Sequence, residues 1–216
     1  GVGYFLHQAQ EKGALCLDGS APLYYHAPGA DLGLNKWYIH FQGGGWCTSF
    51  EDCHGRSLTS LGSTLQDPQF EDLSDGYFSN ISSENPLMHN WNKVLIRYCD
   101  GGSFSGNSSS LFGNTTLNFR GRLIKEAVYE DLIEKRGLKS ATDVVISGAS
   151  AGGLSSYLHA NYVTELLGMQ GQNLLQRHRP RKIVVLPYGG FFLDYAGTNV
   201  NYYRDMKWVF ENMNSR

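Results

Sequence analysis

Three short segments of this 216-residue chain are apolar at almost every position, and this feature restricts the fold more than any other. They read KVLIRY at 93–98, DVVISG at 143–148 and KIVVLP at 182–187. A strand with solvent on one face alternates apolar and polar residues, whereas a strand covered on both faces does not. We therefore expect three buried strands of a mostly parallel sheet, with a fourth strand, WYIHF, at 37–41.

Helical patterns fill the gaps between these strands. Residues 118–137 carry one apolar stripe, charged residues on the other face, and Gly137 as a stop signal. The stripe comprises Leu123, Ile124, Ala127, Val128, Leu132 and Ile133. A second helix is expected from Gly152 to about Leu167. Alternating strands and helices predict an α/β fold with helices flanking the sheet. Without an internal repeat or linker, residues 1–216 are expected to belong to a single domain.

The segment SGASAGG at 147–153 lies where a predicted strand ends and a helix begins. Gly148, Ser150 and Gly152 match the G-x-S-x-G pattern of a nucleophile elbow. In that turn a serine is held in a strained conformation, and small neighbours let the strand and the helix pack closely. An ordinary turn of small residues is the alternative, and the pattern alone does not decide between the two.

A second glycine-rich segment, FQGGGWC at 41–47, follows the strand at 37–41. Enzymes of the α/β-hydrolase type form one side of the oxyanion hole from such a loop, and the other from the amide after the nucleophile. We therefore predict Ser150 as the nucleophile and the backbone N–H groups of Gly44, Gly45 and Ala151 as oxyanion donors. The order of loop and elbow favours a hydrolase over a glycine-rich hairpin.

The charge and the apolar runs restrict the partners. A formal net charge of −2 gives no reason to expect a nucleic acid or an anionic membrane as partner. No apolar stretch approaches the roughly 20 residues that a membrane-spanning helix needs. The chain opens GVGYFL, without a methionine or a clear leader, so we expect any signal peptide to have been removed or not recorded.

Four cysteines and three glycosylation sequons bear on the compartment. The cysteines, Cys16, Cys47, Cys53 and Cys99, admit three pairings. They lack the C-x-x-C spacing of a zinc ribbon or a thioredoxin site, so we expect neither a metal nor a cofactor. The sequons begin at Asn80, Asn107 and Asn114. Such triplets also occur by chance, but two of them in the polar stretch 100–116, with an even number of cysteines, favour a secreted chain.

Five segments in a fixed order carry a family resemblance. They are LCLDGSAPLYY, HFQGGGWC, NWNKVLIRYCDGGSFSG, LNFRGRLI and SGASAGGLSSYLH. From about Leu15 to Phe192 the chain resembles the pectin acetylesterase and Notum family of serine carboxylesterases, and its plant-type branch most. The resemblance implies an α/β-hydrolase-like fold, a Ser–Asp–His triad with Ser150 as nucleophile, a secreted glycoprotein and hydrolysis of a carboxylic ester. It also supports the pairs Cys47–Cys53 and Cys16–Cys99.

The acid and the base of the triad are not found in this chain. The resemblance assigns them to a region after the last predicted strand, but no histidine follows His178, which reads as part of a solvated loop. His159, nine residues after the serine, is displaced by roughly 13 Å along the helix axis. His40 reads as a core or edge residue, and the resemblance does not assign the acid to Asp194. We expect both groups beyond Arg216, so that the chain is an N-terminal portion of the catalytic domain.

Three functions remain open. The first, and our prediction, is a secreted esterase that removes acetyl groups from a polysaccharide such as pectin, through an acyl-enzyme on Ser150. Trp46, Tyr98 and Phe104 are candidates for its pocket, with core packing as the simpler interpretation. The second is a Notum-like deacylase of a lipid-modified protein, which needs a deep apolar pocket. The third is a catalytically inert protein or fragment with the hydrolase fold.

Overall fold

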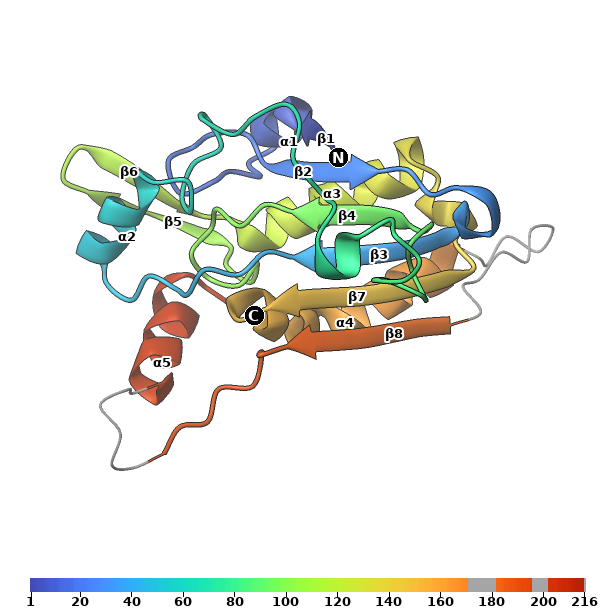
Figure 1. Cartoon of the computed structure of the whole chain (residues 1–216). Coiled ribbons are helices and arrows are strands. Elements are labelled where there is room, and N and C mark those ends of the chain that lie inside the picture. Colours follow the sequence, from blue (N-terminus) through green and yellow to red (C-terminus); the bar gives the residue numbers. More distant parts are fainter. Residues whose placement is uncertain (171–181, 196–201, 216) are drawn as a thin grey trace.

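Six strands form one mixed sheet in the part of the chain that the structure describes. The structure is a computed structural model, and it describes residues 1–170, 182–195 and 202–215. The strands are β1 (Val2–Phe5), β2 (Leu23–Ala27), β3 (Lys36–Phe41), β4 (Asn92–Ile96), β7 (Asp143–Ala149) and β8 (Lys182–Tyr188). They lie in the order β1-β2-β4-β3-β7-β8 (Figure 1). The last four are parallel to one another, whereas β2 runs antiparallel to both β1 and β4.

Two long helices cover one face of this sheet. They are α3 (Gly121–Lys135) and α4 (Ala151–Gln170), and both lie behind the sheet in Figure 1. The front face carries the short helix η2 (Gly76–Phe78), in which the ring of Phe78 lies 5.3 Å from that of Tyr38 on β3. Because both faces are covered, β3, β4 and β7 can be apolar at nearly every position.

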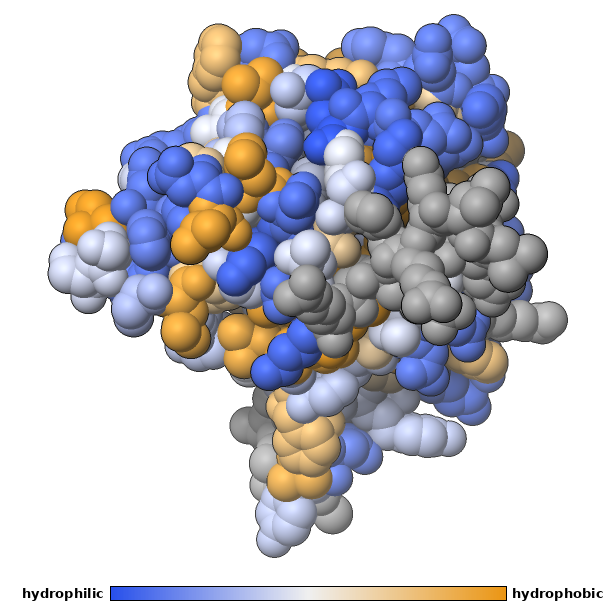
Figure 2. Space-filling model, turned by 90° about the vertical axis from the view of Figure 1, so that its right-hand side faces the viewer, coloured by the Kyte–Doolittle hydropathy of each residue, from blue (hydrophilic) through white to orange (hydrophobic). Residues whose placement is uncertain are grey.

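The shorter elements lie between and beside these strands. They are α1 (His7–Glu11), η1 (Asp31–Gly33), α2 (Phe50–Ser57), the hairpin β5 (Ser108–Phe112) and β6 (Thr115–Phe119), η3 (Leu138–Ser140) and α5 (Tyr202–Asn212). In Figure 1, α2, α5 and the hairpin gather at the left, where β3, β4, β7 and β8 end. Figure 2 shows the opposite side, where those strands begin and where hydrophobic residues form separate patches between hydrophilic ones.

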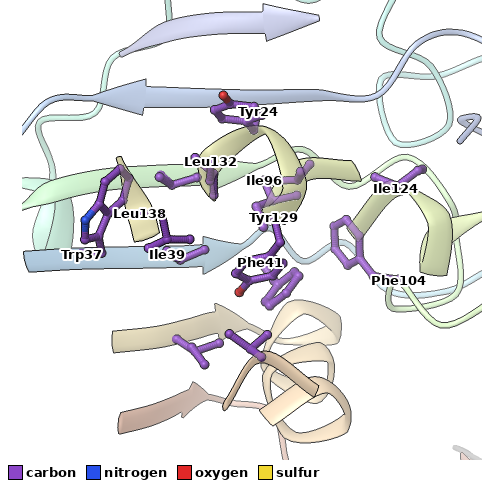
Figure 3. Close-up of a cluster of buried hydrophobic side chains, with 14 of the residues drawn as sticks. Tyr24, Trp37, Ile39, Phe41, Ile96, Phe104, Ile124, Tyr129, Leu132 and Leu138 are labelled. Atoms are coloured by element: carbon purple, nitrogen blue, oxygen red, sulfur yellow. The ribbon is translucent and has the colours of Figure 1, made fainter. Parts of the chain in front are cut away.

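The main core fills the space between the sheet and α3. Trp37, Ile39 and Phe41 alternate along β3 and are all buried on this side (Figure 3). Helix α3 presents to them the stripe that the sequence predicts, with Ile124, Val128, Leu132 and Ile133 buried and Leu123 and Ala127 partly buried. Gly137 adopts a φ of 91°, the left-handed conformation that ends a helix. The spacing of apolar residues therefore decides which face of α3 packs on the sheet.

The predicted α/β fold, with a mostly parallel sheet flanked by helices, is confirmed. All four predicted strands and both predicted helices are present, although β4 ends at Ile96 and α4 begins at Ala151. The sequence patterns do not predict the antiparallel strands β1 and β2, or the hairpin of β5 and β6 that begins within the polar stretch 100–116. The prediction for residues 182–187 was wrong in one respect: β8 is an edge strand of the described sheet and is half-exposed. That residues 1–216 form a single domain stays a prediction.

Candidate active site

Ser150 lies in the turn between β7 and α4, at the end of the sheet where the parallel strands have their carboxyl ends. Its φ is 56°, in the left-handed region that favours glycine, and the residue is exposed. Its backbone N–H donates a hydrogen bond of 2.9 Å to the carbonyl oxygen of Tyr188 on β8. Its carbonyl oxygen accepts one of 3.0 Å from the N–H of Leu154 in α4. An exposed serine in a strained strand-to-helix turn has the geometry of a nucleophile elbow.

The small residues around Ser150 are required by close contacts between backbones. A Cβ atom on Gly148 would lie 2.0 Å from the carbonyl oxygen of Gly152, and one on Gly152 would lie 2.0 Å from that of Phe41. On the facing loop, a Cβ atom on Gly43 would lie 2.1 Å from the carbonyl oxygen of Ala149. No larger residue fits at these positions without moving the backbone. The G-x-S-x-G pattern therefore reflects tight packing of β3, β7 and α4.

The glycine-rich loop after β3 lies against the elbow. In the parallel pairing of β3 and β7, Phe41 is opposite Gly148, so the two strands end side by side. A Cβ atom on Gly43 would lie 3.2 Å from the Cβ of Ser150, which brings the loop into contact with the serine itself. Gly43 and Ser150, more than 100 positions apart in the sequence, thus meet at the carboxyl ends of the parallel strands.

Two side chains hold the carbonyl groups of this loop. The Arg56 Nη1 donates a hydrogen bond of 2.9 Å to the carbonyl oxygen of Gly44, and the Tyr98 hydroxyl donates one of 2.8 Å to that of Gly45. In a trans peptide the next N–H points away from the carbonyl oxygen. The N–H of Gly45 therefore points away from Arg56, and the N–H of Trp46 points away from Tyr98.

Three backbone N–H groups, two in the loop that contacts the serine and one at the start of α4, are free in the described part of the chain. Those of Gly44, Gly45 and Ala151 donate to no acceptor within it. Ala151 is the first residue of α4, and the N–H groups of a first helical turn have no partner inside the helix and carry partial positive charge. Free donors beside an exposed serine are suited to stabilising a negative oxygen.

Both disulfides join segments at this end of the sheet. The structure pairs Cys16 with Cys99 at an S–S distance of 2.05 Å and Cys47 with Cys53 at 2.04 Å, as the resemblance implies. The first joins the N-terminal segment to the chain just after β4. The second joins the end of the glycine-rich loop to α2, the helix that carries Arg56.

Two histidines considered as bases lie in the described part of the chain, His159 buried and His40 partly buried, and both keep other partners. The His159 Nε2 lies 3.2 Å from the carbonyl oxygen of Ser103, and its Nδ1 lies 3.4 Å from the Lys125 Nζ. Burial, and then the charge of Lys125, lower the pKa of His159 to about 3. Burial alone lowers the pKa of His40 to about 4, and its Nδ1 bonds the Tyr38 hydroxyl. Both rings are therefore neutral near pH 7.

No side chain in the described part of the chain activates the serine. The Ser150 hydroxyl forms no hydrogen bond to any residue in that part, and His178 lies outside it. Asp194 accepts a hydrogen bond from the backbone N–H of Tyr203 instead. Within the same residues, no group of three or more His, Cys, Asp or Glu side chains could hold a metal ion.

Three polar residues near the site are not among the predicted site residues: Arg56 and Ser103, which bond the glycine-rich loop, and Asp100. Asp100 is fully buried, and its Oδ2 accepts hydrogen bonds from the backbone N–H groups of Gly102 and Phe104. Burial nevertheless raises its pKa to about 6. An acidic residue two positions after the apolar run 93–98 and directly before two glycines is the signal that points to it.

The three aromatic candidates for the pocket behave differently. Tyr98 and Phe104 are fully buried in the main core, so their simpler interpretation as core residues is correct. Trp46 is half-buried, and its ring centroid lies 4.7 Å from that of Phe192 in an edge-to-face contact. Of the three, Trp46 therefore remains a candidate.

The sequons lie at the surface to different degrees. Asn80 and Asn114 are exposed, whereas Asn107 is half-buried and its Oδ1 accepts a hydrogen bond of 3.2 Å from the Arg120 Nη1. Within the described residues, no helix is both long and apolar enough to span a membrane.

Comparison with known proteins connects this geometry to a family. The model of the pectinacetylesterase family matches residues 3–215. The chain is 42% identical to pectin acetylesterase 5 of Arabidopsis thaliana, over 86% of this chain and 41% of the relative. It is 33% identical to the palmitoleoyl-protein carboxylesterase notum1a of Danio rerio, over 88% of this chain and 36% of the relative. The chain thus spans less than half the length of these curated relatives.

Proposed function

Because this chain belongs to the pectinacetylesterase family, we propose that it forms part of a carboxylic ester hydrolase in which Ser150 is the nucleophile. One observation carries the proposal: an exposed serine with a φ of 56° lies at the start of α4, against a glycine-rich loop with free N–H groups. A structural turn needs neither an exposed hydroxyl nor free donors beside it.

The proposed reaction has two steps. The Ser150 oxygen attacks the ester carbonyl carbon while a base takes its proton, and the negative oxygen accepts hydrogen bonds from the N–H groups of Gly44, Gly45 and Ala151. The alcohol leaves with a proton, and water then cleaves the acyl-enzyme to release the acid. We assign the base and the acid to other parts of the complete protein. The greater length of the relatives supports this assignment.

The proposed substrate is an acetylated polysaccharide such as pectin. Four relatives named pectin acetylesterases are 41–43% identical to this chain, whereas the palmitoleoyl-protein carboxylesterases are 30–33% identical. Removal of a lipid from a protein is the second candidate, favoured by the half-buried Trp46 at the end of the loop. We also propose that the protein is a secreted glycoprotein, which the two disulfides and the exposed Asn80 and Asn114 support.

Release of acetate from acetylated pectin by the complete protein tests the proposal. We expect turnover, labelling of Ser150 by a fluorophosphonate, and loss of both in Ser150→Ala. Ser109→Ala, a change at an exposed serine on β5, is the control and retains both. Release of palmitoleate from a lipidated peptide without release of acetate would support the second candidate. A wild-type protein that neither turns over an ester nor reacts at Ser150 would contradict the esterase itself.

A further inference from the structure

The Ser103 hydroxyl joins the two halves of the proposed oxyanion hole. It donates a hydrogen bond of 2.8 Å to the carbonyl oxygen of Ala151, the first residue of α4. It accepts one of 2.7 Å from the Trp46 Nε1, at the end of the glycine-rich loop. Ala151 and Trp46 are more than 100 residues apart in the sequence, so one buried hydroxyl spans the gap between elbow and loop.

The backbone of Ser103 is held as firmly as its side chain. Its N–H donates to the Tyr98 hydroxyl at 3.0 Å, and that hydroxyl in turn donates to the carbonyl oxygen of Gly45. Its carbonyl oxygen lies 3.2 Å from the His159 Nε2. Because the Lys125 ammonium can only donate, the neutral imidazole accepts at Nδ1 and carries its proton on Nε2. All polar groups of Ser103 are thus bonded.

Ser103 also adopts a backbone conformation that costs free energy. Its φ is 54° and that of Phe104 is 57°, so two successive residues with side chains lie in the left-handed region. Glycine would relieve this strain at position 103, and the two preceding residues, Gly101 and Gly102, are glycines. A glycine at this position, however, could not bond Trp46 and Ala151 together as the Ser103 hydroxyl does. Strain of this kind is typical of residues that position a functional site.

We propose that Ser103 is a positioning residue that fixes the distance between the Ala151 amide and the amides of the glycine-rich loop. This inference rests on the proposed esterase function. Ser103 is 2% exposed, so it acts through Ala151 and Trp46 rather than by touching the ester. Donors that are fixed before the reaction stabilise the negative oxygen that forms in the transition state more than they stabilise the bound ester.

Three variants of the complete protein separate positioning from stability. Ser103→Ala removes the hydroxyl, and Ser103→Gly removes it while relieving the backbone strain. In both we expect kcat for a small acetyl ester to fall about 10- to 100-fold with KM within about twofold, because misplacing the donors costs rate rather than binding. Ser155→Ala is the matched control: its hydroxyl donates to the same Ala151 carbonyl oxygen, at 3.0 Å, but does not reach Trp46. It retains kcat within about threefold.

Two further measurements read the oxyanion hole directly. An alkyl boronic acid forms a tetrahedral adduct on the serine, so its affinity falls in both Ser103 variants by about the same factor as kcat. The second measurement is a double-mutant cycle with Trp46→Phe, which lacks the indole donor. We expect kcat of the double variant, Trp46→Phe with Ser103→Ala, to be no lower than that of the weaker single variant, because both changes break the same hydrogen bond.

The positioning role of Ser103 and the esterase function can fail separately. If the wild type hydrolyses the ester and Ser103→Gly keeps kcat and boronate affinity within twofold, the positioning role is overturned while the esterase stands. A loss in Ser103→Ala that Ser103→Gly restores also overturns it, since strain and not the hydroxyl would then matter. A wild type without turnover and without fluorophosphonate labelling of Ser150 overturns the esterase and, with it, the role of Ser103.

Discussion

The guanidinium of Arg56 donates a hydrogen bond of 2.9 Å to the carbonyl oxygen of Gly44 while its carbon lies 5.1 Å from the centre of the Tyr98 ring. A second bond, from the Arg56 Nε to the carbonyl oxygen of Leu61 at 3.1 Å, fixes the direction of the side chain. One cation from α2 therefore orients the peptide group whose N–H, on Gly45, is a proposed oxyanion donor.

Replacement of Arg56 tests this relationship. Arg56→Ala leaves two carbonyl oxygens without a charged donor, so we expect a loss of about 2–3 kcal/mol in the free energy of unfolding in urea. We also expect kcat to fall at least about tenfold, because the Gly45 amide is no longer held. Arg56→Lys supplies one donor group instead of the planar guanidinium, so we expect its stability and its kcat to lie between those of the wild type and Arg56→Ala. Equal kcat in Arg56→Ala and the wild type would refute the orienting role.

We expect that Gly152 cannot be replaced by a larger residue, for steric reasons. In Gly152→Ala the new methyl group would lie 2.0 Å from the carbonyl oxygen of Phe41, so the free energy of unfolding falls by more than about 3 kcal/mol. Gly168→Ala in the same helix is the matched control, since a Cβ atom there meets no atom within 4 Å. It raises stability by about 0.5–1 kcal/mol. Similar effects of the two changes would contradict the packing.

The buried Asp100 predicts a specific dependence of stability on pH. Burial raises its pKa from 3.8 to about 6, so between these values the folded state binds the proton more tightly than the unfolded state. The stabilisation is complete below about pH 4 and is lost as the pH rises through 6.

Comparison with Asp100→Asn isolates this effect, because the amide does not titrate. From pH 3 to pH 7 the free energy of unfolding of the wild type falls relative to that of the variant by about 3 kcal/mol. Urea unfolding of both proteins at four pH values measures the difference. A difference that stays constant with pH would show that Asp100 keeps an ordinary pKa.

We expect one disulfide to contribute more to stability and the other more to activity. Cys16–Cys99 closes a loop with a sequence separation of 83 and Cys47–Cys53 one of 6. By chain entropy, Cys16→Ala with Cys99→Ala costs about 4.5 kcal/mol, and Cys47→Ala with Cys53→Ala about 2.4 kcal/mol. The second pair nevertheless lowers kcat more, because it releases α2 and Arg56 from the glycine-rich loop. Thermal unfolding and ester turnover, measured on the same samples, check whether the pair that costs less stability costs more activity.

The sequence was informative wherever neighbouring residues decide the structure. The apolar runs at 93–98 and 143–148 predict strands, and the apolar stripe of α3 predicts its buried face. The glycines around Ser150 predict the elbow. These features depend on backbone conformation and side-chain periodicity within one segment, which residue types reveal directly.

Tertiary structure decided the rest, because it depends on contacts between distant segments. The apolar run at 182–187 reads like a buried strand, but its place at the edge of the described sheet depends on which strands pair with it. Ser103 and Arg56 read as a loop serine and a helix arginine, and their bonds lead to residues that lie 48 and 12 positions away. The sequence alone therefore determined the local shape of the elbow and the loop, whereas only folding determined which side chains hold the two together.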